Sequence, residues 1–289
     1  MAGKVKIYLE MIKFQHSIFA LPFAYLGAFL ARMRVPELET LFWITLAMVG
    51  ARSFAMAVNR LIDREIDRRN PRTSARALPQ GLLSAWNVVV FSFFSLAVFL
   101  LAVYHLTPIC RYLWPAVVIP FVIYPYTKRF TWLSHFVLGF CLGLAPVGAW
   151  IAVTNTLSPE PLIIGAAVLL WVAGFDIFYA IQDMDFDIRQ KLHSIPSRFG
   201  ISTSLALTRI LHFTAVALLV WLGIRLEMGI FYFAGVAAAA LLLAYENSII
   251  KANDLSRLNV AFFTMNGIVS IVMFCFVAME IFFRNPGNV

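Results

Sequence analysis

The chain has 289 residues, of which 61% are hydrophobic and only 13% are charged, and its mean hydropathy is +0.83. This composition excludes an ordinary soluble globular domain, which needs far more charged surface to stay in solution. Two runs, Ala77–Cys110 and Phe130–Pro159, contain no Asp, Glu, Lys or Arg, and about 20 apolar residues are enough to cross a bilayer. The sequence therefore predicts an all-α, multi-pass integral membrane protein with the lipid bilayer as its main partner.

Nine membrane spans fit the apolar runs, and together they form a single domain over residues 1–289. The N-terminal lysines precede an apolar run as they do in a signal peptide, but no small-residue cleavage site follows, so we interpret the run as a retained first span. The fourth span is short and contains three prolines, so a count of eight stays open. The predicted spans are Phe14–Ala31, Leu38–Asn59, Ser84–Leu106, Tyr112–Tyr126, Leu133–Val153, Leu162–Asp183, Leu205–Ile224, Met228–Ser248 and Leu258–Phe283.

The net charge of +8 reflects membrane orientation better than nucleic-acid binding, because the cations are scattered among loops. Seventeen of the 23 Lys and Arg residues fall in the N-terminal segment and in the loops after even-numbered spans. The positive-inside rule makes that side cytoplasmic. We expect no nucleic-acid partner and no obligate protein partner.

Two rows of polar residues at four-residue spacing carry the chemistry. Asn59, Asp63 and Asp67 form the first row, and Tyr179, Asp183 and Asp187 form the second. On a helix, residues four apart share a face. The rows follow spans two and six, so both lie on the cytoplasmic side, and each opens a four-helix unit of what we interpret as a weak internal repeat. The fold expected is thus two related four-helix halves plus one helix around a central cavity with a cytoplasmic cap.

Carboxylates at a membrane boundary are costly unless they are paired or bound to metal, so two such clusters need a cause. The simplest explanation is that these acids lie in solvated loops and pair with nearby arginines. Paired carboxylates beside the cations and hydroxyls of the segments 68–76 and 191–198 also suit a diphosphate bridged by Mg²⁺. Acids at helix ends could instead mark a transporter or cation pathway, although such sites prefer the bilayer midplane.

The motifs resemble a known family. Asn59-x3-Asp63-x3-Asp67, then Arg72-Thr and Arg76-x-Leu-Pro, together with Asp176-Ile-Phe-Tyr179-Ala-x-x-Asp183-x3-Asp187, resemble the paired signatures of the UbiA-type intramembrane aromatic prenyltransferases. The resemblance covers nearly the whole chain. It implies a nine-helix bundle that transfers a polyprenyl group from polyprenyl diphosphate to a ring carbon of a hydroxylated aromatic acid, in a quinone pathway of a prokaryotic inner membrane.

The resemblance also implies roles for individual residues. Asp63, Asp67, Asp183 and Asp187 would be catalytic by binding Mg²⁺, and Asn59 would assist at the first metal. The candidate diphosphate contacts are Arg72, Lys128 and Lys191. Asp176 and Tyr179 would lie nearer the aromatic acceptor.

Arg52 lies seven residues before Asn59, about two helical turns deeper on the same face. Its guanidinium would suit a carboxylate on the acceptor, or it could be a buried partner of Asp176 or of a helix-end carbonyl. His135 and the other isolated histidines are interpreted as structural. The segment His193-Ser-Ile-Pro196 resembles members of the futalosine route to menaquinone, so 4-hydroxybenzoate and a dihydroxynaphthoate both stay open as acceptors.

Overall fold

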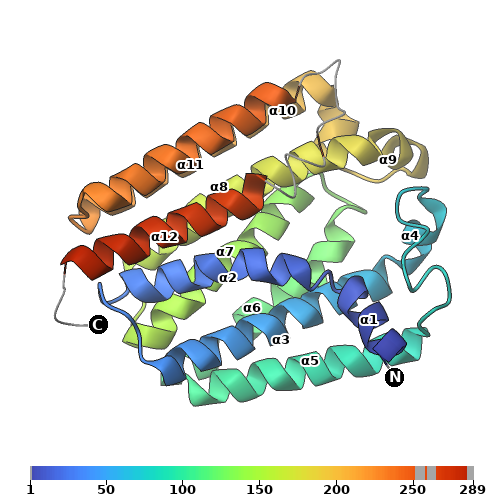
Figure 1. Ribbon diagram of the computed structural model, residues 1–289. Coiled ribbons are helices and arrows are strands. Elements are labelled where there is room, and N and C mark those ends of the chain that lie inside the picture. Colours follow the sequence, from blue (N-terminus) through green and yellow to red (C-terminus); the bar gives the residue numbers. More distant parts are fainter. Residues whose placement is uncertain (1, 251–257, 259–264, 285–289) are drawn as a thin grey trace.

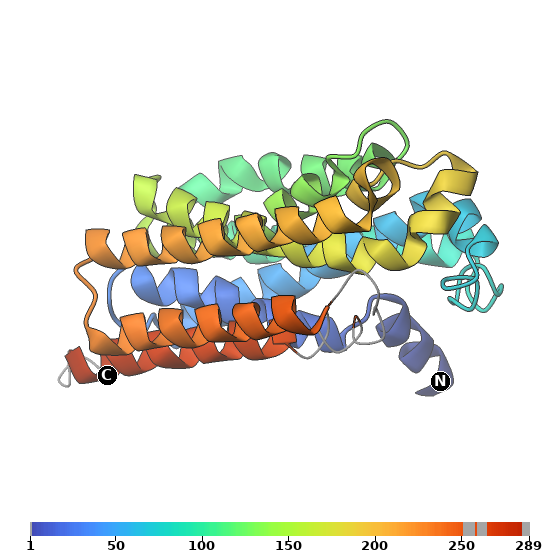
Figure 2. The same ribbon diagram turned by 90° about the horizontal axis from the view of Figure 1, so that it is seen from above.

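The computed structural model describes residues 2–250, 258 and 265–284, and these residues contain helices and no strand. Figure 1 shows the long helices running roughly along one axis, and Figure 2 shows the same bundle from above. The helices are α1 Ala2–Met11, α2 Gln15–Leu30, α3 Leu38–Ile62, α4 Arg64–Arg69, α5 Ala85–His105, α6 Pro108–Thr127, α7 Ser134–Thr154, α8 Pro159–Ala180, the 3-10 turn η1 Ile181–Asp183, α9 Met184–Gln190, α10 Ile195–Arg225, α11 Ile230–Ile249 and α12 Asn266–Arg284.

Eight of the described helices are long and apolar enough to cross a membrane, which confirms a multi-pass membrane protein. The shorter α2, with 16 residues, corresponds to the first predicted span. The predicted ninth span begins at Leu258, but residues 259–264 lie outside the described part of the chain, and α12 is described from Asn266.

Helix starts follow local chemistry. Ser84 caps α5 by accepting a hydrogen bond from the backbone N–H of Asn87. Ser194 and Ser197 form a reciprocal capping box at the start of α10. Proline occupies the first or second helical position of α6, α8 and α10, where its missing N–H costs nothing.

Small residues allow α7 and α8 to pack very closely. A Cβ atom added to Gly139 would lie 2.3 Å from the carbonyl oxygen of Leu169, and one added to Gly143 would lie 2.5 Å from that of Gly165. Glycines four residues apart on one face are the usual way for membrane helices to approach at backbone distance. This contact holds in register the two helices that form one wall of the cavity.

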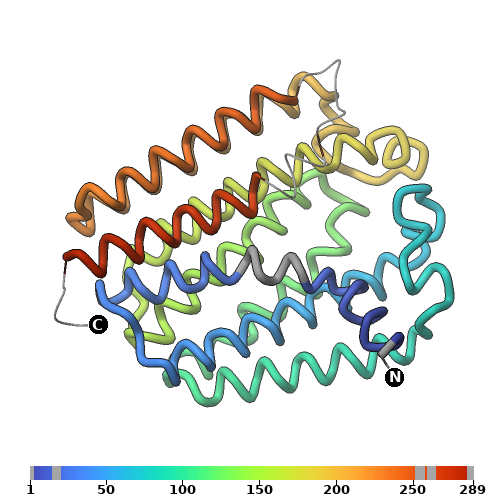
Figure 3. The backbone as a smooth tube through the Cα atoms, viewed as in Figure 1, coloured from blue at the N-terminus to red at the C-terminus, as the bar shows by residue number. Residues whose placement is uncertain are grey.

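Helix α2 joins the early and late parts of the bundle. Helix α2 packs against α3, α7 and α12, and the other long helices mostly pack against their neighbours in the chain. The backbone trace in Figure 3 shows this back-and-forth path along the bundle axis.

Helices α4 and α9 lie at the same end of the bundle (Figure 1). Each follows an acid at a break in the helix, with φ −91° and ψ 2° at Asp63 and φ −99° and ψ 0° at Asp183. The predicted row from Asn59 to Asp67 is therefore bent at Asp63 and does not lie on one straight helix. The four-residue spacing survives the bend, because the N–H of Asp63 donates to the Asn59 carbonyl and that of Asp67 donates to the Asp63 carbonyl.

Candidate active site

A cavity of about 550 Å³ opens at this end of the bundle. Its mouth is lined by the acids of both motifs and by basic side chains. Its interior is walled largely by apolar residues of α3, α5, α6, α7 and α8. Along α3 the lining extends from Asp63 to Ile44, which is roughly 28 Å at 1.5 Å per residue. The cavity thus joins a charged mouth to an apolar interior about as deep as a bilayer core.

Asp63 is held by side chains of α3 and of the segment that follows α6. Its carboxylate accepts a hydrogen bond from Lys128 Nζ at 2.6 Å and one from Arg129 Nη2 at 3.1 Å, and both cations follow α6. Asn59 Nδ2 donates to the same carboxylate at 3.2 Å. The Asp63 carboxylate is almost completely buried, and these donors supply the hydrogen bonds that a buried polar group needs.

Asp67 has its own cation from the loop that follows α4. Arg76 Nη1 lies 2.7 Å from both carboxylate oxygens. The hydroxyl of Thr73 donates to the Asp67 backbone carbonyl at 3.0 Å, which folds the loop back over α4. The loop after the first motif thus curls over the mouth of the cavity.

The same loop reaches across to the second motif. Arg72 Nε donates to Asp183 Oδ1 at 2.9 Å, Nη2 donates to Asp183 Oδ2, and Nη1 donates to the Tyr179 hydroxyl at 2.7 Å. Asn70 Nδ2 adds a bond to Asp183 Oδ1 at 2.8 Å. Burial lowers the pKa of Arg72, but hydrogen bonding to Asp183 and the charge of that carboxylate more than offset this and raise it above its ordinary value.

Asp187 completes the mouth from α9. Its Oδ2 accepts a hydrogen bond from the hydroxyl of Ser194 at 2.9 Å. The N–H of His193 donates to the carbonyl of Lys128 at 2.7 Å, which ties the segment after the second motif to the end of α6. Motifs 120 positions apart in the sequence therefore meet at one opening through Arg72 and Lys128.

The remaining predicted residues lie in two places. Arg52, Asp176 and Tyr179 line the cavity, whereas Lys191 is exposed, does not line it and ends α9 with a left-handed backbone. Glu65 and Asp185 are exposed, which confirms that they face away from the site.

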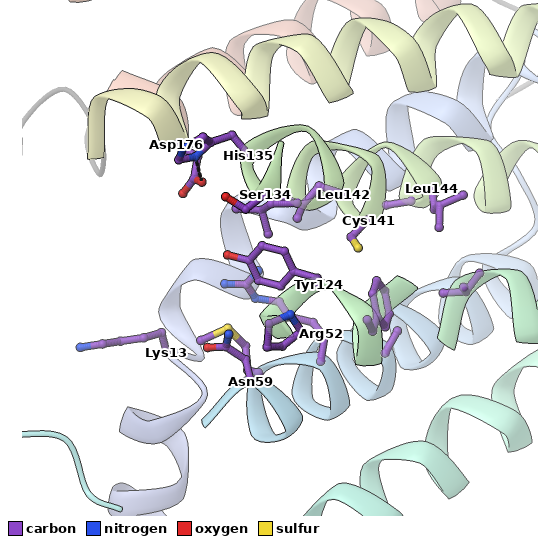
Figure 4. Close-up of a pocket in the computed structure, with 18 of the residues that line it drawn as sticks. Lys13, Arg52, Asn59, Tyr124, Ser134, His135, Cys141, Leu142, Leu144 and Asp176 are labelled. Carbon is purple, nitrogen blue, oxygen red and sulfur yellow. Dashed lines mark hydrogen bonds and ion pairs between the residues drawn. The ribbon is translucent and has the colours of Figure 1, made fainter. Parts of the chain in front are cut away.

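Below the mouth, a polar chamber lies inside the apolar part of the cavity. Figure 4 shows Asp176 beside His135 on one wall, Arg52 on the other, and the Tyr124 ring between them. His135 Nδ1 lies 2.7 Å from Asp176 Oδ2, so the partner of Asp176 is His135 rather than Arg52. Arg52 Nε is buried and has no hydrogen-bond partner in the described part of the chain.

Sequence patterns did not reveal several of these residues. Asn70, Arg129 and Ser194 contact the motif acids, and Tyr124 and His135 line the chamber. Arg129 follows Lys128 directly, and Ser194 lies seven residues after Asp187, so their closeness in sequence to predicted site residues could have suggested both. No local pattern points to Tyr124.

The carboxylate oxygens at the mouth suit a hard cation that also binds phosphate. All four motif acids offer oxygen atoms, which Mg²⁺ prefers. Within residues 2–250, 258 and 265–284, no three His, Cys, Asp or Glu side chains form a ready-made cage. Mg²⁺ is commonly held by one or two carboxylates, phosphate oxygens and water rather than by an all-protein cage, so this arrangement fits a metal that arrives with its ligand.

Comparison with known proteins settles the family. Residues 20–268 match the UbiA prenyltransferase family. The chain belongs to this family. One relative within it, named 4-hydroxybenzoate octaprenyltransferase, from Marinobacter nauticus, is 32% identical over 231 residues, covering 80% of this chain and 78% of the relative.

Solved structures of UbiA homologues share the fold. The apo structure of a homologue from Aeropyrum pernix K1 superposes with a TM-score of 0.84 at 32% identity, covering 92% of this chain and 98% of that one. A homologue from Archaeoglobus fulgidus, solved with DMAPP and Mg²⁺, has a TM-score of 0.74 at 20% identity, covering 95% and 98% of the two chains. Membership of the UbiA family makes the chain a membrane prenyltransferase and gives no support to the transporter alternative.

Proposed function

We propose that this protein transfers a polyprenyl group from polyprenyl diphosphate to the ring carbon ortho to the hydroxyl of 4-hydroxybenzoate, in ubiquinone biosynthesis. The observation that carries the proposal is the meeting of two acidic motifs and their cations at the mouth of a deep apolar cavity. The name of the Marinobacter relative supports the choice of acceptor. A dihydroxynaphthoate remains the acceptor to test beside it.

The diphosphate would lie at the mouth between the two motifs. Asp63, Asp67, Asp183 and Asp187 would hold Mg²⁺, assisted by Asn59, and the metal would neutralise the charge that develops on the departing diphosphate. The A. fulgidus homologue, whose structure contains DMAPP and Mg²⁺, supports a divalent metal beside the diphosphate.

Arg72 and Lys128 would contact the diphosphate directly, since both already point into the mouth. Their donors are bound to Asp183, Tyr179 and Asp63, and a diphosphate could accept the same bonds. Fixed cations aimed at a leaving group need no reorganisation as the C–O bond breaks. Lys191 is exposed outside the cavity, so a direct diphosphate contact would require a different side-chain position in the loaded enzyme.

The aromatic acceptor would occupy the polar chamber. The unpartnered Nε of Arg52 suits the acceptor's carboxylate, because a buried guanidinium without an anion is costly. Asp176 and Tyr179 lie on the opposite wall, nearer the mouth. This arrangement would place the hydroxyl end of the ring close to the diphosphate end of the donor.

The apolar interior would bind the prenyl chain and exclude water. An allylic cation in contact with water is rapidly lost to hydrolysis, so a dry wall protects the reaction. The lining along α3 is long enough for several isoprene units.

We further propose that the mouth faces the cytoplasm of a prokaryotic cell and that residues 1–289 act as one catalytic domain without an obligate protein partner. The basic residues around the mouth, such as Arg72, Arg76 and Lys128, support this orientation by the positive-inside rule.

Purified protein tests the function directly. In detergent or nanodiscs with Mg²⁺ and a polyprenyl diphosphate, we expect a prenylated product by mass spectrometry with 4-hydroxybenzoate, and Asp63→Ala should abolish it. Asp185→Ala, at an exposed acid of the same sequence type, is the matched control. A lack of product with both 4-hydroxybenzoate and a dihydroxynaphthoate would refute the proposed function.

A further inference from the structure

Asp176 differs from the motif acids in its partners. Asp63, Asp67 and Asp183 each pair with Lys or Arg side chains, and Asp187 accepts a hydrogen bond from Ser194, whereas Asp176 has only a histidine partner in the described part of the chain. The side chain of Asp176 is 18% exposed, towards the cavity.

The histidine is fixed in one tautomer. The backbone N–H of Ile195, at the start of α10, donates to His135 Nε2 at 3.3 Å. An imidazole nitrogen that accepts a hydrogen bond carries no proton, so the proton lies on Nδ1 and is donated to Asp176 Oδ2 at 2.7 Å. This contact leaves the second carboxylate oxygen of Asp176, Oδ1, without a hydrogen-bond partner in the described part of the chain.

Asp176 is attached to its helix nearer the mouth of the cavity than Arg52 is. Asp176 lies seven residues before Asp183 on α8, and Arg52 lies eleven residues before Asp63 on α3. At 1.5 Å per residue these are depths of roughly 10 and 16 Å below the mouth. An acceptor whose carboxylate is bound by Arg52 would therefore direct its hydroxyl towards the mouth, on the side of Asp176.

We propose that Asp176 is the base that accepts the phenolic proton of the acceptor, and that His135 is a positioning residue which holds it for this task. The inference rests on the proposed function and adds a requirement to it: the acceptor must carry a free hydroxyl beside the carbon that is prenylated. A methyl ether in its place, as in 4-methoxybenzoate, would bind without reacting.

The reaction balances with the groups present. Asp176 takes the phenolic proton as the ortho carbon bonds to the allylic C1 and the C1–O bond breaks, its electron pair leaving with the diphosphate. The ring is then a dienone with one hydrogen on the new tetrahedral carbon. A diphosphate oxygen removes that hydrogen as a proton, the C–H electrons restore the aromatic ring, and Asp176 returns its proton to the phenolate oxygen.

Few other titratable groups face Asp176. Helix α7 contributes His135 and Cys141, and α10, which also packs on α8, contributes His212 against Gly174. Across the chamber are Tyr124 and Arg52 (Figure 4). Of these, His135 is the only group with a hydrogen bond to Asp176 within the described residues.

Asp176→Asn tests the base, because asparagine keeps the shape and can still accept the proton of His135 Nδ1. We expect kcat with 4-hydroxybenzoate to fall about 100-fold, in the range typical of a general base, while the KM for the donor stays within about twofold of the parent value. The logarithm of the variant's kcat/KM for the acceptor should rise by about one per pH unit as more acceptor ionises in solution, whereas the parent profile should be flat.

A more acidic acceptor should rescue the variant. 3-Fluoro-4-hydroxybenzoate ionises at lower pH and keeps one free ortho carbon, so the ratio of parent to variant rates should shrink at least tenfold. A purely structural role of Asp176 would leave the pH profile and this ratio unchanged, and that result would overturn the inference.

The histidine provides a second, independent pair of variants. In His135→Asn the amide nitrogen can take the place of Nδ1 and donate to Asp176, whereas in His135→Leu it cannot. We expect the asparagine variant to keep at least ten times the kcat of the leucine variant, and equal rates would contradict the positioning role. These variants also test the inference if Asp176→Asn does not fold, which a thermal shift with the donor will show.

Controls separate the inference from the proposed function. Asp185→Asn, at an exposed acid on α9, should match the parent at every pH. If the parent gives no prenylated product, the proposed function is wrong and the inference fails with it. If the parent is active and Asp176→Asn equals it, the inference alone is wrong.

Discussion

Arg72 links the two acidic motifs, and replacing it with lysine tests whether the geometry of its guanidinium matters or only its charge. The side chain donates three hydrogen bonds, two to Asp183 and one to Tyr179. The central carbon of its guanidinium group, Cζ, also lies 4.7 Å from the centre of the Tyr179 ring. Lysine keeps the charge, but its single nitrogen on a flexible stem cannot reproduce the planar fork.

The structure gives the size of the effect. Arg72→Lys should lose about two of the three bonds, whether their acceptors are Asp183 and Tyr179 or the oxygens of a bound diphosphate. At about 1.5 kcal/mol for each charge-assisted bond, the loss is about 3 kcal/mol, or about 100-fold in kcat/KM. Little discount for solvent is needed, because the side chains of Arg72 and Asp183 are only 29% and 17% exposed.

The assay is prenylated product formation at varied donor concentration in detergent or nanodiscs. Arg68→Lys is the matched control, since Arg68 is 63% exposed and pairs only with Glu65 on its own helix in the described structure. We expect the control to equal the parent. A kcat/KM for Arg72→Lys within threefold of the parent value would refute the reasoning, because charge alone would then be sufficient.

Three further predictions concern packing, the acceptor and the metal. Gly139→Ala should lower the apparent Tm in detergent by the equivalent of about 1–3 kcal/mol of overpacking, because the added Cβ would meet a backbone oxygen of α8. The control Gly148→Ala should leave the Tm unchanged, because its added Cβ meets nothing within 4 Å. Equal losses of Tm in the two variants would contradict the close packing of α7 on α8. Arg52→Gln should raise the KM for 4-hydroxybenzoate about 10- to 100-fold through the loss of a charge-assisted pair, with an unchanged donor KM; a change confined to the donor KM would place Arg52 elsewhere in the reaction. Chelation of divalent cations with EDTA should abolish product formation, and added Mg²⁺ should restore it; full activity in EDTA would exclude the metal-bound diphosphate.

The fold was accessible from the sequence because apolar runs have to match the thickness of a bilayer. The second span was predicted as Leu38–Asn59, and α3 covers Leu38–Ile62. Errors occur where polar residues or prolines belong to a helix. Helix α6 begins at Pro108, four residues before the predicted Tyr112, and contains Pro115, Pro120 and Pro125.

Helix α10 shows the same limitation more strongly. It begins at Ile195, ten residues before the predicted Leu205, and its first turns are polar enough to be mistaken for a loop. The backbone kinks at Gly200, where φ is 79°, so the polar turn lies across the end of the bundle. Short helices such as α1 and α4 carry no signal of membrane length, and the sequence did not predict α1.

The site was predictable where its residues are close in sequence and otherwise not. The spacing of Asp63 with Asp67, and of Asp183 with Asp187, is local, so the two acidic rows could be found. Their cations are not local: Arg129 lies 66 positions from Asp63, and Arg72 lies 111 positions from Asp183. His135 was interpreted as structural because it is isolated in an apolar run, and no local pattern could show that its partner, Asp176, lies on another helix.

The most direct test of one diphosphate bound by both motifs is electron paramagnetic resonance with Mn²⁺ in place of Mg²⁺ and a non-cleavable prenyl thiodiphosphate. The analogue should raise the affinity of the parent for Mn²⁺, and this gain should disappear equally in Asp63→Asn and in Asp183→Asn. If either variant keeps the full gain, one motif is sufficient, and the shared site at the mouth of the cavity is contradicted.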